Sequence, residues 1–190
     1  MDNKLDSEFK FLDYKQDNYD FNFVTDKGVF SKNKINYLSI LLVREYLKYN
    51  NKKLNVLDIG AGYGFIGVVI NKITNSNVTL SDVSNRALHL CKMNVLRNKC
   101  DNISIVNSDA YSNIKDSYDV IISNPPVNAG KDKIKEMLDG INHLNKDGEI
   151  WFVILKNNGA ESLINYFSSK YKLNIVYKKK GIYIIRMKEC

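Results

Sequence analysis

The sequence predicts an α/β fold in which helices cover both faces of a mostly parallel sheet. Three observations lead to this prediction. Short apolar runs alternate with amphipathic helical patterns through most of the 190 residues. Glycine or an acidic residue follows several of these runs, as at the turns that leave parallel strands. The last two runs, residues 173–177 and 182–187, are joined by a link too short for a crossover, so they must pair as an antiparallel hairpin.

The N-terminal part of the chain carries a weaker pattern. We expect residues 1–18 to form a flexible segment, because they are polar and show no clear period. Alternating aromatic and polar side chains predict a strand at residues 19–24, followed by a turn. Ser31 or Asn33 is expected to cap the next helix. That helix carries apolar side chains on one face at three- and four-residue spacing, at Ile35, Leu38, Leu41, Leu42, Tyr46 and Tyr49.

The rest of the chain alternates strands and helices. We expect strands at residues 54–59, 78–81, 103–106, 118–123 and 149–155. Helices are expected directly after Gly64 and at residues 84–97, 131–144 and 160–167. Together with the C-terminal hairpin, this order predicts a Rossmann-like, doubly wound, seven-stranded sheet. Ligands of such sheets bind outside the carboxyl ends of the strands, where Gly60, Asp82, Asp109 and Asn124 fall.

Composition narrows the class of protein. Lys and Arg number 28 against 21 Asp and Glu, a net charge of +7 that favours a polyanionic partner such as nucleic acid. The three cysteines, Cys91, Cys100 and Cys190, lack C-x-x-C spacing, which argues against a disulfide framework or a metal site. The polar N-terminus does not read as a secretory signal, and no apolar run has membrane-spanning length. We therefore expect a cytoplasmic protein that binds neither a metal nor a membrane.

A glycine-rich loop separates the strand at 54–59 from the next helix. Gly60, Gly62 and Gly64 stand where the backbone must turn tightly and approach a ligand closely. Asp82 ends the following strand about twenty residues later, a position from which a carboxylate reaches ribose hydroxyls. This spacing predicts a cofactor that contains a nucleoside. The alternative is a helix-packing loop with a solvated Asp82.

The loop also indicates which cofactor is bound. It runs G-x-G-x-G and is preceded by Asp58, whose charge would repel the pyrophosphate of a dinucleotide. An acidic residue suits the ammonium and sulfonium groups of S-adenosylmethionine. Asp109, at the end of the third strand of this series, is expected to accept a hydrogen bond from the adenine amino group; the alternative is a helix N-cap or a loop carboxylate. Val83 and Ala110, which follow these two strand ends, are expected beside the cofactor.

The strand at 118–123 ends in Asn124-Pro125-Pro126. These are the only two prolines of the chain, and together they fix two φ angles and remove two N–H donors. Pro125 also keeps Asn124 out of the helical region. The Asn124 side chain and the Pro125 carbonyl therefore form a rigid set of acceptors at the end of a buried strand. We predict a catalytic role for all three residues; the alternative is a stiff turn without chemistry.

Three segments carry a resemblance to a known family. They are Gly28-Val29-Phe30-Ser31, Asp82-Val83-Ser84-Asn85-Arg86-Ala87 and Asn124-Pro125-Pro126-Val127-Asn128-Ala129-Gly130-Lys131. With the glycine loop they resemble the class I S-adenosylmethionine-dependent methyltransferases that have an N-P-P catalytic loop. More closely, they resemble the ribosomal RNA small subunit methyltransferase C family. The chain departs from that family at Asn36 and Leu38, where an aspartate and a glycine are usual, and at Asn128, where an arginine is usual.

The resemblance implies a reaction and a partner. It implies that residues 19–190 form a single class I methyltransferase domain that methylates guanine N2 in 16S rRNA, within the 30S subunit or as free RNA. Asn124 and the Pro125 carbonyl would hold the exocyclic amine of the base. Phe30 is the candidate stacking partner of the base, although a core position is an alternative. The remaining substrate-binding candidates are Ser31, Val127, Lys131 and Lys156.

Other functions use similar motifs. The N-P-P loop also occurs in enzymes that methylate adenine N6 or a protein glutamine, so these acceptors are alternatives. A nucleotide-binding dehydrogenase is disfavoured by the loop spacing. A non-catalytic RNA-binding module is disfavoured because the glycines, Asp82 and Asn124-Pro125-Pro126 are all intact.

Overall fold

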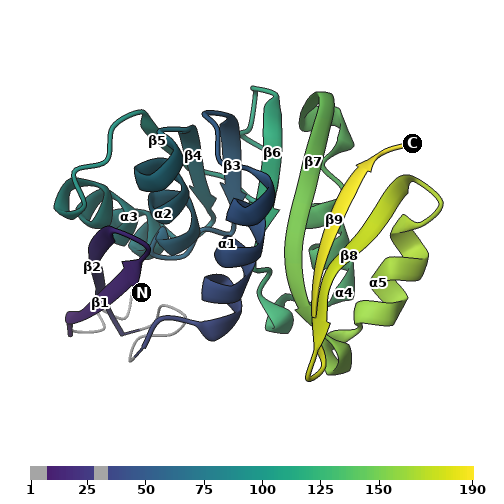
Figure 1. Cartoon of the computed structure of the whole chain (residues 1–190), viewed down its shortest axis with the longest axis horizontal. Helices are drawn as coiled ribbons and strands as arrows, with labels where there is room; N and C mark the ends of the chain where they lie inside the picture. Colours follow the sequence, from purple (N-terminus) through teal and green to yellow (C-terminus); the bar gives the residue numbers. More distant parts are fainter. Residues whose placement is uncertain (1–7, 28–33) are drawn as a thin grey trace, which may run out of the picture.

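The structure, a computed structural model, describes residues 8–27 and 34–190. Its centre is a seven-stranded sheet with the strand order β5-β4-β3-β6-β7-β9-β8 (Figure 1). The strands are β3 (Asn55–Ile59), β4 (Asn77–Asp82), β5 (Ile103–Asn107), β6 (Tyr118–Ser123), β7 (Leu144–Leu155), β8 (Tyr171–Lys179) and β9 (Ile182–Glu189). The helices are α1 (Tyr37–Tyr49), α2 (Phe65–Thr74), α3 (Asn85–Arg97), α4 (Lys131–Leu138) and α5 (Ala160–Phe167).

Strand direction follows the order of the chain. The strands β3 to β7 pair in parallel, as expected for strands joined by helical crossovers. Strand β9 lies between β7 and β8 and is antiparallel to both, so it alone runs against the rest. The predicted fold, a Rossmann-like sheet with an antiparallel C-terminal hairpin, is confirmed.

Alternating side chains divide the core between the two faces of the sheet. Along β7, Trp151 and Val153 point into the cluster formed with α1, α2 and α3. Phe152 and Ile154 point into the second cluster, which includes apolar residues of α4 and α5. This two-residue period gives every central strand two buried faces, which is why the strands read as nearly continuous apolar runs.

A separate two-stranded ribbon, β1 (Lys10–Gln16) with β2 (Tyr19–Thr25), packs beside α2 and α3 (Figure 1). The expectation that residues 1–18 are loosely held is therefore wrong for β1. Leu12 and Tyr14 face the core, but Phe11 points outward with 61% of its surface exposed and lies under the Arg97 guanidinium. An aromatic residue on the outer face concealed the alternation.

Two asparagines of α3 complete the outer edge of β2. The Asn94 side chain bonds both the N–H and the carbonyl of Val24, at 2.7 and 2.9 Å. The Asn98 side chain does the same for Asn22, at 3.0 Å each. These side chains take the place of the backbone groups of a third strand. The free N–H and carbonyl groups of the edge strand β2 are therefore hydrogen-bonded by side chains and not by another strand.

Several element boundaries differ from the sequence predictions, including those of α1 and α4 and the start of β7. Helix α1 begins at Tyr37 with Asn36 as its N-cap, whereas Ser31 and Asn33 lie outside the described residues. Helix α4 stops at Leu138 and does not reach residue 144. Gly140 follows in a turn where a Cβ would collide with the side chains of Tyr111 and Ile121, and β7 already begins at Leu144.

Neither a membrane-spanning helix nor a metal-binding cluster occurs among the described residues. No helix among them is long and apolar enough to cross a membrane. No group of three or more His, Cys, Asp or Glu side chains among them is arranged to hold a metal ion.

Candidate active site

A cavity of about 360 Å³ opens at the carboxyl ends of β3, β4, β5 and β6. Four predicted residues, each after or at the end of a different strand, line it together: Gly60, Asp82, Asp109 and Asn124. The volume falls in the range of small-molecule sites. The cavity therefore lies where ligands bind in open parallel sheets.

The glycine loop forms one wall of this cavity. The N–H groups of Gly60 and Ala61 both donate to the Ser81 carbonyl, at 2.8 and 2.9 Å, which ties the loop to the end of β4. Gly62 has a φ of +59°, and a Cβ added there would meet no atom of the described residues within 4 Å, apart from its chain neighbours. The loop therefore leaves backbone open to the cavity, so that a ligand can approach it closely.

Asp82 is held by two backbone donors. Its Oδ2 accepts from the Gly62 N–H and its Oδ1 from the Ser84 N–H, both at 2.9 Å. These bonds fix the carboxylate at the junction of the glycine loop, β4 and the start of α3. Each carboxylate oxygen keeps a lone pair for a further donor such as a hydroxyl.

Asp58 and Gly64 lie behind the wall of the cavity and do not line it. Asp58 is fully buried; its Oδ2 accepts from the Gly67 N–H at 2.9 Å, while its Oδ1 has no partner among the described residues. Burial raises the pKa of Asp58 to about 7, and the charge of Asp82 adds to this against the opposing Gly67 bond. Gly64 begins α2 in the left-handed region and packs against Cys91.

The end of β5 contributes another part of the cavity wall. Asp109 is exposed and forms an ion pair with Lys133 of α4, and both residues line the cavity. Ala110 is buried in the wall. Val83 also lines the cavity and leaves 65% of its surface exposed, an apolar surface available to a ligand.

The Asn124-Pro125-Pro126 segment contacts the start of α1. The Asn124 Nδ2 donates to Ser39 Oγ at 2.8 Å and lies 3.5 Å from Asn36 Oδ1. Both α1 residues line the cavity. No pattern in the sequence indicated that either residue belongs to the site; the one signal was that an asparagine before a helix suits an N-cap.

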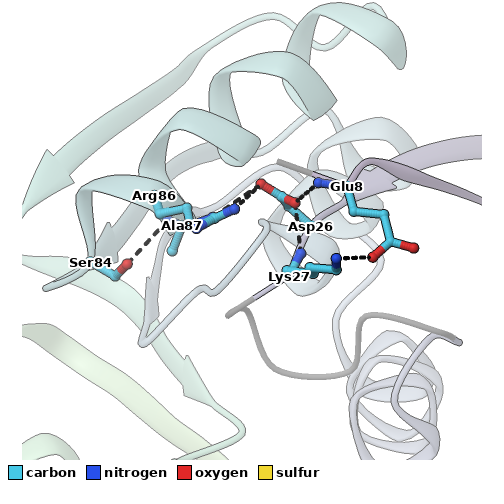
Figure 2. Close-up of polar contacts among 6 residues, drawn as sticks. All are labelled: Glu8, Asp26, Lys27, Ser84, Arg86 and Ala87. Carbon is cyan, nitrogen blue, oxygen red and sulfur yellow. Dashed lines mark hydrogen bonds and ion pairs between the residues drawn. The ribbon is translucent and has the colours of Figure 1, made fainter. Parts of the chain in front are cut away.

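A second contact absent from the sequence analysis lies beside the cavity. Figure 2 shows the Asp26 carboxylate held by the Arg86 guanidinium at 2.6 Å and by the N–H groups of Glu8 and Lys27 at 2.7 Å each. Burial of Asp26 opposes its charge, but Arg86 and the two N–H groups outweigh this and lower its pKa. The bond fixes the end of β2 at the start of α3, next to Ser84 of the cavity wall.

Two of the predicted substrate-binding residues, Lys131 and Lys156, do not line the cavity. Lys131 and Lys156 are exposed on the loops and helix starts that follow β6 and β7. They share this edge, since the Lys131 Cε lies 3.8 Å from the Cβ position of Gly159, three residues after Lys156. Val127 begins the short turn after Pro126, and Phe30 and Ser31 lie outside the described residues.

The lining suits S-adenosylmethionine better than a dinucleotide. Ile59, Phe65 and Met137 supply apolar wall, and Asp82 and Asp109 supply negative charge. Among the described lining residues the only lysine or arginine is Lys133, and its charge is paired with Asp109. A cationic sulfonium with ribose hydroxyls fits this lining, whereas the pyrophosphate of a dinucleotide would lack an unpaired cation.

Comparison with known proteins agrees with this geometry. The sequence model of the methyltransferase small domain matches residues 20–186. The uncharacterized protein YbxB of Bacillus subtilis is 35% identical over 177 residues, covering 90% of this chain and 88% of its own length. Ribosomal RNA small subunit methyltransferase C of Buchnera aphidicola is 33% identical over 168 residues, covering 84% of this chain. The chain spans 47% of that relative's length.

A solved structure supports the fold. The 16S rRNA N2 methyltransferase of T. thermophilus, in complex with AdoMet and guanosine, superposes with a TM-score of 0.83 at 18% identity. The match covers 96% of this chain and 51% of that one. The resemblance seen in the motifs is thus confirmed, as is S-adenosylmethionine as the cofactor of the family. The chain belongs to the methyltransferase small-domain family.

Proposed function

We propose that this protein transfers a methyl group from S-adenosylmethionine to guanine N2 in 16S rRNA of the small ribosomal subunit. The observation that carries the proposal is the position of Asn124. Its amide lines the same cavity as the glycine loop and Asp82, with Nδ2 bonded to α1. Within residues 8–27 and 34–190, no donor bonds its Oδ1. In the proposed reaction, this acceptor receives a hydrogen bond from the amine of the base.

The acceptor pair suits an exocyclic amine. Such a nitrogen is a poor nucleophile because its lone pair is delocalised into the ring. Hydrogen bonds from its two hydrogens to Asn124 Oδ1 and the Pro125 carbonyl favour a tetrahedral nitrogen whose lone pair points out of the ring plane. The rigid Pro125-Pro126 backbone holds both acceptors in place, so positioning and electrostatics carry the rate without a strong base.

The remaining wall suits the cofactor. S-Adenosylmethionine, when bound, supplies an electrophilic methyl group. Asp82 would accept hydrogen bonds from the ribose hydroxyls. Asp109 would accept a hydrogen bond from the adenine amino group. The open backbone at Gly62 lets the ligand lie against the loop. We propose that Asp58, behind the loop, adds negative potential toward the cationic end of the cofactor once pH exceeds its pKa of about 7.

The exposed lysines that follow β6 and β7 suit an RNA backbone. A guanine must leave its stack to reach a cavity of this kind. Lys131 and Lys156 stand on the loops beside the cavity, and the chain carries a net charge of +7. These charges match phosphates that flank an extruded base. A ribosomal RNA substrate also places the reaction in the cytoplasm.

The relatives agree with this substrate and leave two other acceptors to test. The Buchnera aphidicola relative and the T. thermophilus structure are named for methylation of small-subunit rRNA. A ribosomal protein L11 methyltransferase of Lactobacillus johnsonii is 32% identical over 102 residues but covers only 53% of this chain. Protein is therefore included as an acceptor in the test, and DNA is included because the Asn124-Pro125-Pro126 motif also occurs in enzymes that methylate adenine N6.

The test is a transfer assay with labelled S-adenosylmethionine. The purified protein is incubated in parallel with 30S subunits, free 16S rRNA, DNA and ribosomal protein. We expect label in 16S rRNA, recovered after nuclease digestion as N2-methylguanosine at one mapped nucleotide. Label recovered as N6-methyladenine, label in protein alone, or no label in any acceptor would contradict the proposal.

A further inference from the structure

We propose that Ser39, with Asn36, is a positioning residue that fixes the orientation of the Asn124 side-chain amide. The inference rests on the proposed role of Asn124 as an acceptor for the substrate amine. Ser39 and Asn36 belong to the start of α1, 85 and 88 residues before Asn124, and line the same cavity. They determine which end of the amide faces the substrate.

The orientation follows from Asn36. The Asn36 side chain caps α1, and its Oδ1 accepts from the N–H groups of Leu38 at 2.8 Å and Ser39 at 3.3 Å. Because both of these partners are donors, the atom that faces them must be the oxygen of Asn36. The Asn124 amide atom 3.5 Å from this oxygen must in turn be a donor, which identifies it as Nδ2.

Ser39 supplies the shorter contact. Its hydroxyl oxygen lies 2.8 Å from Asn124 Nδ2, and the residue is buried with 8% of its surface exposed. The two amide hydrogens thus have two acceptors on α1. The carbonyl end, Oδ1, is left to the substrate, and within residues 8–27 and 34–190 it has no donor.

A flipped amide would lose both features. Its Oδ1 would face Asn36 Oδ1, so two acceptors would oppose each other. Its Nδ2 would then point to the substrate amine, whose own hydrogens need acceptors. A flip therefore removes one of the two acceptors on which the proposed reaction depends. In this way the residues at the start of α1 keep the Asn124 amide in the orientation in which Oδ1 faces the substrate.

The kinetic test compares single substitutions. Ser39→Ala removes the closer acceptor and is expected to lower kcat at least tenfold, with the Kd for S-adenosylmethionine changed less than twofold by calorimetry. Ser39→Thr keeps the hydroxyl and should recover most of kcat. Ser76→Ala is the matched control. Ser76 is also a buried serine, but it directly precedes β4, at the amino end of that strand, whereas the cavity lies at the carboxyl ends. This control should lower Tm without lowering kcat.

A double substitution shows whether Ser39 acts through Asn124. In an Asn124→Ala background, Ser39→Ala should leave the residual rate unchanged within twofold. A further tenfold loss in that background would show that Ser39 acts independently and would overturn the inference. An equal loss of kcat in Ser39→Ala and Ser76→Ala would also overturn it, because the effect would then be one of general stability.

A measurement without any methyl acceptor separates this inference from the proposed function. The side-chain amide of Asn124 is assigned in a 15N-labelled protein by its absence from Asn124→Ala. We expect two separate hydrogen signals with slowed solvent exchange, and fast exchange in Ser39→Ala. Fast exchange in the unsubstituted protein would overturn the inference even if rRNA is methylated. Slow exchange without rRNA methylation would uphold it while the proposed function fails.

Discussion

The Arg86 guanidinium lies 2.6 Å from the Asp26 carboxylate, joining the end of β2 to the start of α3. Asp26 is 2% exposed, and its other oxygen accepts from the N–H groups of Glu8 and Lys27. The chain leaves β2 here and is described again from Lys34, shortly before the Asn36 cap. The ion pair thus fixes one end of the segment whose other end leads to Asn36 and Ser39.

Removing this carboxylate should destabilise the fold. Asp26→Ala leaves the Arg86 charge without its partner and two N–H groups without their acceptor. We expect a loss of about 3 kcal/mol in the free energy of unfolding, as for a broken buried pair. Urea denaturation measures it. Asp20→Ala breaks the exposed pair with Lys15, 3.6 Å apart, and should cost less than about 1 kcal/mol; equal losses would contradict this account.

Gly62→Ala tests whether the loop backbone faces the cofactor. The added Cβ meets no atom within 4 Å in the part of the chain that the structure describes, so the fold should lose only about 1 kcal/mol for the positive φ. The same methyl group enters the cavity and should weaken S-adenosylmethionine binding at least tenfold by calorimetry. Gly181→Ala, with a φ of +75° in the β8–β9 turn, should cost similar stability and leave cofactor affinity unchanged.

Asp58 predicts a specific dependence of stability on pH. Burial raises its folded pKa to about 7, against about 3.9 in an unfolded chain. The contribution of Asp58 to the free energy of unfolding is therefore fully present below about pH 4 and is lost as pH rises through 7. Asp58→Asn lacks this loss, so its free energy of unfolding relative to the unsubstituted protein should rise by roughly 3 kcal/mol from pH 5 to pH 8. A difference that is flat with pH would contradict the buried, uncompensated carboxyl.

Lys131 and Lys156 are expected to contact RNA phosphates. Replacing both by alanine should weaken RNA binding and reduce the slope of log K against log salt by about 1.4, or 0.7 per phosphate contact. Filter binding over a salt series measures the slope. The double substitution Lys52→Ala and Lys53→Ala removes the same charge from the loop before β3. This loop lies at the amino end of the strand, away from the carboxyl ends that carry the cavity. If this pair changes the slope equally, the effect is one of net charge.

The sequence predicted the features that depend on local pattern. The two-residue period and the strand–helix alternation placed Gly60, Asp82 and Asn124 at strand ends, and parallel pairing then brings such ends together. Strand β1 was missed because the exposed Phe11 broke the alternation of its two faces. The end of α4 was missed because the restriction on Gly140 comes from Tyr111 and Ile121, distant in sequence.

The contacts that position the site depend on tertiary structure. Asn124 and Ser39 are 85 residues apart, and Asp26 and Arg86 are 60 apart. Each residue alone suits an ordinary local role, as a helix residue, a turn or a solvated charge. Only the packing of α1 and β2 beside the sheet brings each one to its partner.

The most direct test of the central claim is Asn124→Ala, measured by two methods on one preparation. We predict that transfer of labelled methyl to 16S rRNA falls at least a hundredfold, while calorimetry gives a Kd for S-adenosylmethionine within threefold of the unsubstituted protein. Full transfer with intact cofactor binding would contradict the role assigned to the Asn124 amide.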